Sequence, residues 1–525
     1  MEAAEAVCAG EEIAPVDVLP LLRCLVDKSL VVVESSGGRY RLLETLRHFG
    51  RAQLPARENA AMLSARHLAH YRAVAEQAAQ VVHAGPEAIQ LERIEPDYEN
   101  IRQALSWALE VGEEQEGLSL AGSLGWYWWY RGYFGEGRRW LGSLLALPQA
   151  GARTQARERA LYSQALLQFG AGWQAGRFWH GTVERRAQHE EGLAIAHEVG
   201  DEVTRARHLT YLGLAMGIVD YAGALARLDE ALTLAAKIDD RWLVHVALAV
   251  LAAVAWANDD QPAAHNWVLQ SLEQSQRDRD QNGYARALNF LASMTFAEGD
   301  SAAARRLLEE SLAIARTLHD RFGTALVLGI LGVVAAVQGD SAAAQACFEE
   351  KRALWEQVGE RNGIAGALRD LGWLARRERA LPEARAFYTD ALGLERDLVD
   401  TIGIAVSLAG LGDVAYCNGN HAQASACYDQ GLALLPEGDA WNERATCLDG
   451  LARVAFTTGD ARRAAWLCGA AAARRRPDLT ISPVTVAGST EVMVAARTVL
   501  GEAAFAAAWA AGQDAEAEEQ ASTQP

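Results

Sequence analysis

The stretch that decides the fold is ALVLGILGVVAAVQGDSAAAQACF, residues 325–348. Its first half carries apolar residues at spacings of three, three and four, which lie on one face of a helix: Ala325, Leu328, Leu331 and Ala335. Gly339 then suits the left-handed position after a helix, and Asp340 suits the cap before the next one. Ala344 and Phe348 continue the apolar pattern, so the stretch predicts a helical hairpin with an apolar inner side.

The same pattern returns every forty residues from Asp201 onward. One column of these blocks holds alanine in all seven: Ala224, Ala264, Ala304, Ala344, Ala384, Ala424 and Ala464. A second column holds leucine in six of the seven: Tyr211, Leu251, Leu291, Leu331, Leu371, Leu411 and Leu451. A single hairpin cannot bury its apolar side, so such units must stack on their neighbours. The repeat therefore predicts an all-α protein built as an α-solenoid.

The hairpins resemble tetratricopeptide repeats, whose signature places an alanine twelve residues after the glycine of a Leu-Gly pair and an aromatic residue four residues later. The sequence matches that signature three times, at Leu331-Gly332 with Phe348, Leu371-Gly372 with Tyr388, and Leu411-Gly412 with Tyr428. The period of forty exceeds the family's usual one of about thirty-four residues. Here we expect the small Ala344 to face Gly332 and let the two backbones approach closely. The resemblance implies seven such repeats over residues 201–477, preceded by two looser, aromatic-rich units over residues 113–200.

The N-terminal part of the chain has a different rhythm. An amphipathic helix over residues 18–28 leads into the β-branched run 31–33, a turn, and an alternating run over 39–43. This helix and hairpin resemble the wing half of the winged helix in bacterial signal-transduction ATPases with numerous domains (the STAND class, with NB-ARC- and LuxR-like transcriptional regulators). The resemblance implies a partial winged-helix module over residues 1–56, within a chain that corresponds to the sensor portion of such a regulator.

Two further segments fit the resemblance to the STAND class, and one motif of that class is absent from the sequence. The resemblance implies a helical connector over residues 57–112 and a helical cap with a polar tail over residues 478–525. The sequence contains no G-x-x-x-x-G-K-[ST] phosphate loop, so the ATPase of that family has no counterpart in this sequence.

Composition restricts the classes of partner. Lysine and arginine number 49 against 68 aspartates and glutamates, a formal net charge of −19 that repels phosphate backbones and anionic membranes. We therefore expect no membrane partner and little direct binding of nucleic acid. The seven cysteines are scattered without a C-x-x-C pair, which is typical of a reducing compartment. With no signal peptide and no apolar run of membrane-spanning length, a cytoplasmic location is expected.

The densest aromatic cluster has two interpretations. It comprises Trp126, Tyr127, Trp128, Trp129, Tyr130, Tyr133, Phe134 and Trp140, with Trp173, Phe178 and Trp179 nearby. The rings could stack on a sugar or grip a peptide, but most of them are better explained as core between early repeats. The histidines form no H-E-x-x-H zinc motif and no catalytic pairing, so we expect no cofactor, no metal and no enzymatic activity.

The concave groove of the repeats is the favoured binding site. Positions that line this surface in tetratricopeptide arrays correspond here to Trp256, Arg286, Asn289, Phe296, Arg369, Trp373, Arg376, Arg377, Asp413, Tyr416, Asp449 and Arg453. In the fifth block, Arg369, Trp373 and either Arg376 or Arg377 share a helical face and could hold a carboxylate or phosphate. The alternative is a solvated face with ion pairs to Glu378 or Asp370.

Three functions follow from these patterns. The first is a non-catalytic scaffold or sensor in a bacterial signalling or transcription-regulatory system, which binds a protein segment or a small effector in its groove. The second is a DNA-binding transcriptional regulator that acts through the winged helix, although that helix offers only Arg23 and Lys28 as basic residues. The third is an enzyme with the aromatic region as a carbohydrate pocket, which lacks an identifiable acid–base pair.

Overall fold

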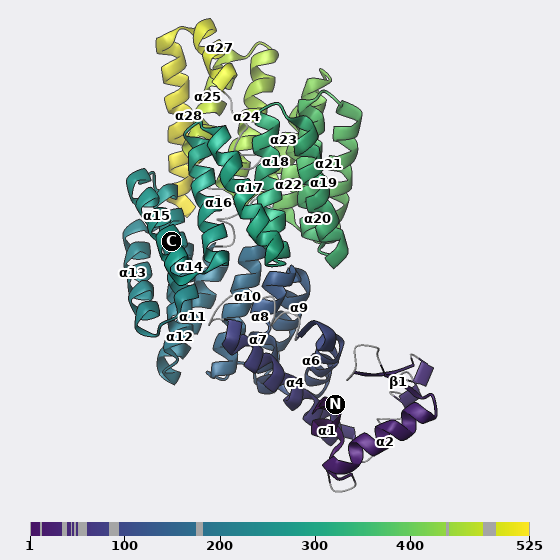
Figure 1. Ribbon diagram of the computed structural model, residues 1–525. Helices are drawn as coiled ribbons and strands as arrows, with labels where there is room; N and C mark the ends of the chain where they lie inside the picture. Colours follow the sequence, from purple (N-terminus) through teal and green to yellow (C-terminus); the bar gives the residue numbers. More distant parts are fainter. Residues whose placement is uncertain are drawn as a thin grey trace. The chain divides into compact units, whose positions relative to one another are not determined.

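The protein is described from a computed structural model, over residues 2–10, 13–33, 39–43, 45–46, 49–50, 60–82, 94–174, 182–436, 440–475 and 490–523. Helices dominate these residues, and those of the repeats run as antiparallel pairs (Figure 1). The prediction of an all-α solenoid with a small N-terminal winged-helix part is thereby confirmed. The helix and antiparallel hairpin of that part are present, with Val31 paired to Leu42 and Val33 to Tyr40.

The chain divides into two compact units. The first unit comprises Met1–Val82, Glu87–Tyr127 and Arg139–Gln164, and the second contains Trp128–Arg138 together with Ala165–Pro525. Elements up to α10 are α1 (Glu2–Cys8), α2 (Pro15–Asp27), β1 (Val31–Val33), β2 (Tyr40–Leu42), α4 (Ala60–Val82), the 3-10 turn η2 (Glu95–Asp97), α6 (Tyr98–Val111), α7 (Glu114–Ser123), α8 (Gly125–Arg131), α9 (Phe134–Leu145) and α10 (Gln155–Gln174).

The second unit continues as hairpins of nearly constant length. Its helices are α11 (Thr182–Val199), α12 (Glu202–Met216), α13 (Tyr221–Lys237), α14 (Arg241–Ala257), α15 (Gln261–Asp278), α16 (Gln281–Ala297), α17 (Ser301–Thr317), α18 (Arg321–Val337), α19 (Ser341–Val358), α20 (Arg361–Arg377), α21 (Leu381–Asp397), α22 (Thr401–Cys417), α23 (His421–Leu434), α24 (Trp441–Thr457), α25 (Ala461–Arg474), α27 (Thr490–Leu500) and α28 (Glu502–Thr523). From α12 to α25, each even-numbered helix is the first of a hairpin and the following odd-numbered helix is the second.

Capping residues set the ends of these helices. A carboxylate or amide before the helix accepts a hydrogen bond from a backbone N–H in the first turn at Asp201, Asp220, Asp240, Asp260, Asp280, Asp300, Asp320, Asp340, Glu360, Asp400, Asn420 and Asp460. Each such cap contributes about 1 kcal/mol. Gly339, with φ of +86°, ends α18 in the left-handed region directly before the Asp340 cap. The Gly-Asp pair therefore breaks and restarts the helix, as the sequence predicts.

The repeated spacing between the Leu-Gly pair and the aromatic ring corresponds to a contact between the glycine and the ring. The ring of Phe348 occupies the space beside Gly332, because a Cβ at Gly332 would overlap that ring. The approach of Ala344 to Gly332 stays a prediction. Tyr428 shows the same relation twice, since a Cβ at Gly412 would lie 2.7 Å from its Cε1 and one at Gly450 would lie 2.5 Å from it. The glycines thus make room for an aromatic ring between successive first helices.

The last helices cover the apolar end of the array. Helices α27 and α28 pack on α25, and Ala465, Ala496, Phe505 and Ala508 form a buried cluster between them (Figure 1). Arrays of this kind need a terminal element that shields the exposed side of the last hairpin.

Three further properties concern the described residues. None of their helices is long and apolar enough to cross a membrane. Over the same residues, histidine, cysteine, aspartate and glutamate side chains form no cluster that could hold a metal ion. All seven cysteines are free thiols.

Candidate binding site on the repeats

Three successive first helices contribute a row of charged and aromatic side chains. This acid–base row comprises Arg376 and Arg377 at the end of α20, Asp413 and Tyr416 on α22, and Arg453 on α24. These positions recur because equivalent residues of neighbouring repeats are separated by forty residues, so they align along one side of the stacked helices.

Asp413 is the centre of the row. Its Oδ1 accepts a hydrogen bond of 2.7 Å from the Tyr428 hydroxyl and pairs with Nη2 of Arg453. Its Oδ2 lies 3.5 Å from Nε of Arg376. Burial alone would raise the pKa of Asp413, but the guanidinium groups of Arg453 and Arg376 together hold that pKa below its ordinary value. The carboxylate is therefore ionised at neutral pH and bridges three repeats.

The row also presents aromatic rings and an exposed guanidinium group. Cζ of Arg453 lies 5.2 Å from the ring centroid of Tyr416, whose hydroxyl is 2.9 Å from Oγ1 of Thr457. Cζ of the exposed Arg377 lies 5.8 Å from the ring of Trp373. Nε of Arg376 is buried without a hydrogen-bond acceptor. A row of this composition can bind a carboxylate or a backbone carbonyl beside an apolar group.

The structure separates Arg369 from the other residues of the fifth block. Its side chain is 7% exposed and pairs with Glu395 of α21, and Glu395 also accepts a hydrogen bond of 2.6 Å from Ser407. Asp370, which was an expected partner of that face, instead binds Nζ of Lys351 at 2.7 Å. The structure therefore brings Trp373 and Arg377 together, and Arg376 and Asp413 together, while Arg369 lies between the helices of its own repeat.

The other predicted positions are dispersed. Trp256 and Asn289 are buried, Phe296 packs against the apolar core, and the Asp449 carboxylate pairs with Arg475. Arg286 lies with its Cζ 5.9 Å from the ring of Trp242. Their use in ligand binding stays a prediction.

A small cavity lies in the earlier repeats, next to Arg286. Its volume is about 40 Å³, and its lining includes Trp129, Phe169, Tyr211, His245, Arg286 and Phe290. A volume of that size accommodates no more than a few water molecules. The cavity has the aromatic and basic lining of a ligand pocket but not the volume of one.

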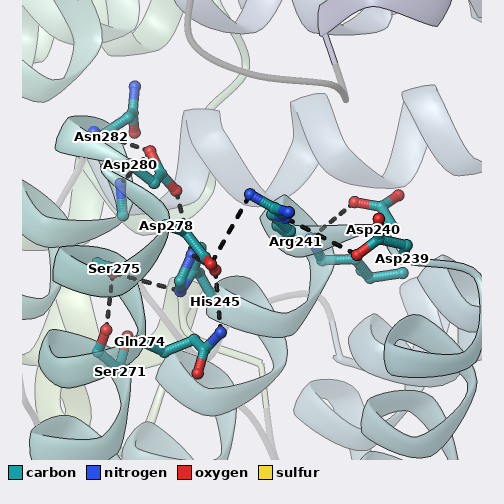
Figure 2. Close-up of polar contacts among 12 residues, drawn as sticks. Asp239, Asp240, Arg241, His245, Ser271, Gln274, Ser275, Asp278, Asp280 and Asn282 are labelled. Carbon is teal, nitrogen blue, oxygen red and sulfur yellow. Dashed lines mark hydrogen bonds and ion pairs between the residues drawn. The ribbon is translucent and has the colours of Figure 1, made fainter.

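His245 beside this cavity forms a polar cluster that the sequence did not reveal (Figure 2). Its Nδ1 is 3.2 Å from Oγ of Ser275, and its Nε2 lies 3.4 Å from Asp278 and 3.6 Å from Asp280. Burial lowers the pKa of His245, against the opposing effect of Asp280 and Asp278. Only the close placement of α14, α15 and α16 reveals the cluster, because these residues follow no short motif.

The cluster contains the residue types of a serine–histidine–carboxylate triad, but its serine is not accessible to a substrate. Ser275 is 1% exposed, and its Oγ donates a hydrogen bond of 2.7 Å to the carbonyl of Ser271. A nucleophile must reach its substrate, and Ser275 is not among the residues that line the cavity. The arrangement therefore gives the serine no route to a substrate, and its role is to satisfy buried polar groups between three helices.

Comparison with known proteins decides the nature of the repeats. Residues 283–350, which span α16 to α19, match the family model described as tetratricopeptide repeat. These residues are tetratricopeptide repeats. The match contains one full Leu-Gly hairpin with Gly332 and Phe348, so the family resemblance stated from those residues is confirmed.

Curated relatives contain the same kind of sequence. Proteins of Mycobacterium bovis and Mycobacterium tuberculosis with the name "Putative HTH-type transcriptional regulator" are 36% identical over 247 residues, which make up 46% of this chain and 27% of each relative. The chain thus spans about a quarter of the length of the curated relatives it matches.

Two solved structures illustrate the similarity of the chain to known folds. One is a signal transduction ATPase with numerous domains with a tetratricopeptide repeat sensor from Pyrococcus horikoshii (15% identity, 90% of this chain, 59% of that chain, TM-score 0.37). The other is Rap protein complexed with competence and sporulation factor (14% identity, 73% of this chain, 96% of that chain, TM-score 0.47).

The sequence thus predicts the tetratricopeptide repeats, but it does not predict which of their charged side chains pair with one another.

The aromatic cluster has two parts in the structure. Trp126, Tyr127 and Trp128 are buried, as the core interpretation expects, whereas Trp129 also lines the cavity. Phe178 and Trp179 lie outside the described residues.

Proposed function

We propose that the chain is a non-catalytic scaffold or sensor of a bacterial transcription-regulatory system, located in the cytoplasm, and that it binds a segment of a partner protein along the acid–base row. Tetratricopeptide repeats and relatives named as transcriptional regulators support this assignment. The observation that carries it is the continuous row of Arg376, Asp413, Tyr416 and Arg453 across three repeats.

The chemistry of the row favours a peptide over a small anion. Asp413 neutralises part of the charge of Arg376 and Arg453, so the row offers donors and acceptors in alternation rather than a concentrated positive charge. An extended peptide presents alternating N–H and C=O groups over a length of several repeats. The exposed guanidinium of Arg377 is a donor that a bound carbonyl or carboxylate can reach.

Photocrosslinking tests this function. A photoreactive phenylalanine analogue replaces Tyr416, which lies in the row, and in a control chain it replaces Asp390, which is exposed on the second helix α21. After illumination in living cells, we expect Tyr416 to give one predominant adduct that maps to a single protein segment, and Asp390 to lack it. Identical adducts from both positions, or none from Tyr416, would remove the row as the binding site.

The name of the relatives favours a second function, DNA binding through α2 and the β1–β2 hairpin. A gel-shift experiment at moderate salt on a genomic fragment library tests it. Retention of specific fragments that survives competitor DNA would support DNA binding, and uniform salt-sensitive retention would count against it.

A further inference from the structure

The segment Trp128–Arg138 belongs to the second unit, although the residues on both sides of it belong to the first. We call this segment the aromatic strap. It contains the end of α8 and the start of α9, with Trp129, Tyr130 and Phe134 among its residues. The forty-residue repeat pattern does not predict this assignment. The strap contacts residues of the repeats that lie far from it in sequence.

Two rings of the strap dock on one ring of the repeats. The ring centroid of Trp129 lies 4.7 Å from that of Phe322 in an edge-to-face arrangement, and the centroid of Phe134 lies 5.4 Å from it. All three side chains are at most 8% exposed. Aromatic pairs of this geometry each contribute about 0.5–1.5 kcal/mol beyond the burial of area. Phe322, in the first turn of α18, is therefore the anchor point of the strap.

Backbone and polar contacts extend the docking to both sides of Phe322. The amide of Gly135 donates a hydrogen bond of 3.0 Å to Oε2 of Glu360, the residue that caps α20. At the other end, burial raises the pKa of Tyr130, and the nearby guanidinium of Arg286 on α16 opposes that effect. The strap thus crosses the beginnings of α16, α18 and α20, which are the first helices of three successive repeats.

The fit depends on a glycine at the bend of the strap. Gly132 has φ of +76°, and a Cβ there would lie 2.7 Å from Cζ3 of the buried Trp355. Both the backbone angle and the space require glycine. A cavity of about 40 Å³ lies beside Trp129, and Phe169, Tyr211 and Arg286 also line it.

Aromatic anchors and a hydrogen bond from a backbone N–H are contacts that also hold bound peptides. We propose that the aromatic strap is an internal occupant of a second peptide site, along the starts of α16, α18 and α20, and that a partner segment of the same chemistry displaces it. The caps Asp280, Asp320 and Glu360 lie along this site, and the guanidinium of Arg286 interacts with Asp280 and Asp320. The partner segment therefore carries two aromatic residues five positions apart, as Trp129 and Phe134 are, followed by an arginine at the place of Arg138, which interacts with Glu360.

The site is separate from the acid–base row, so its test does not depend on the proposed function. The probe is a fluorescein-labelled peptide with the sequence of residues 126–140, WYWWYRGYFGEGRRW. Fluorescence anisotropy compares its binding to the full chain and to the variant Trp129→Ala/Phe134→Ala, whose strap has lost both anchors. Because an occupied site lowers the apparent affinity by the fraction of open molecules, we expect the variant to bind at least about tenfold more tightly.

Matched variants separate displacement from unspecific binding. A peptide with alanine at positions 129 and 134 should not bind, and Phe322→Ala in the strap variant should abolish binding of the original peptide. Gly135→Pro provides a milder opening, because proline is tolerated in the first helical turn and removes only the N–H that Glu360 accepts. We expect it to bind the peptide more tightly than the unaltered chain does. Equal peptide affinity for the unaltered chain, the Gly135→Pro chain and the double variant would overturn the proposal.

Discussion

Replacement of Asp413 by alanine tests the acid–base row most sharply at the level of stability. The change removes the acceptor of the Tyr428 hydroxyl and the counter-charge of Arg453 and Arg376. Loss of one partner from a buried ion pair costs about 3–5 kcal/mol. The side chains of Asp413, Arg376 and Arg453 are 17%, 20% and 23% exposed, so water partly solvates the guanidinium groups left behind. We therefore expect the lower end, about 3 kcal/mol.

The control for this change is Asp413→Asn. The amide keeps an oxygen acceptor for Tyr428 and loses only the charge, so the expected cost is about 1–2 kcal/mol. Repeat arrays can unfold in parts, which makes a single unfolding free energy ambiguous. The assay is therefore native-state hydrogen exchange of the α22 and α24 amides, which reports the local free energy of opening.

A double-mutant cycle with Arg453→Ala isolates the interaction itself. We expect a coupling energy of about 1–3 kcal/mol between positions 413 and 453, as for charged residues in direct contact. Additive effects of the two single changes, or a loss below about 0.5 kcal/mol for Asp413→Ala, would show that the row is a set of solvated surface charges.

Two further predictions concern packing and pH. Gly332→Ala should destabilise the chain by about 1–3 kcal/mol, because its Cβ would overlap the enclosed ring of Phe348, and chemical denaturation measures this. Gly393→Ala on α21 is the matched control: its Cβ would have no neighbour within 4 Å, so it should stabilise by about 0.5–1 kcal/mol. Burial, with His208 and Arg185 nearby, lowers the pKa of His189 well below its ordinary value, so His189 is neutral in the folded chain. The neutral side chain therefore contributes fully to the free energy of unfolding above the unfolded pKa of about 6.5, and this contribution declines as the pH falls below that value. The melting temperature should drop between pH 7.5 and 5.5, and it should drop less in the His189→Gln chain.

The sequence predicts most of the repeat architecture because each hairpin is encoded locally. The apolar spacing, the Gly339-Asp340 break and the aspartate caps all act within one or two turns of helix. The contact of the Phe348 ring with Gly332 was not predicted, since a column of alanines and a ring four residues later both satisfy the same spacing. Only the three-dimensional packing shows that Phe348 fills the space.

The binding surfaces were less predictable, for a physical reason. A forty-residue period places side chains on a face but does not specify which charges neutralise each other across repeats. Arg369 shares the helical face of Trp373 in projection, yet its guanidinium pairs with Glu395 of the following helix. The contact of Gly135 with Glu360 joins residues 225 positions apart, and no local pattern encodes such a pair.

The central claim is that the side chains of the acid–base row recognise the partner segment. Its most direct test is calorimetric titration of the crosslinked segment, made as a peptide, into Arg377→Glu and Arg385→Glu chains. Both residues are exposed and both substitutions change the net charge equally, but Arg377 lies in the row and Arg385 on the second helix α21. We predict that Arg377→Glu weakens binding at least about tenfold, a difference of about 1.4 kcal/mol, while Arg385→Glu leaves it within about twofold. Equal affinities of the two variants would contradict the claim.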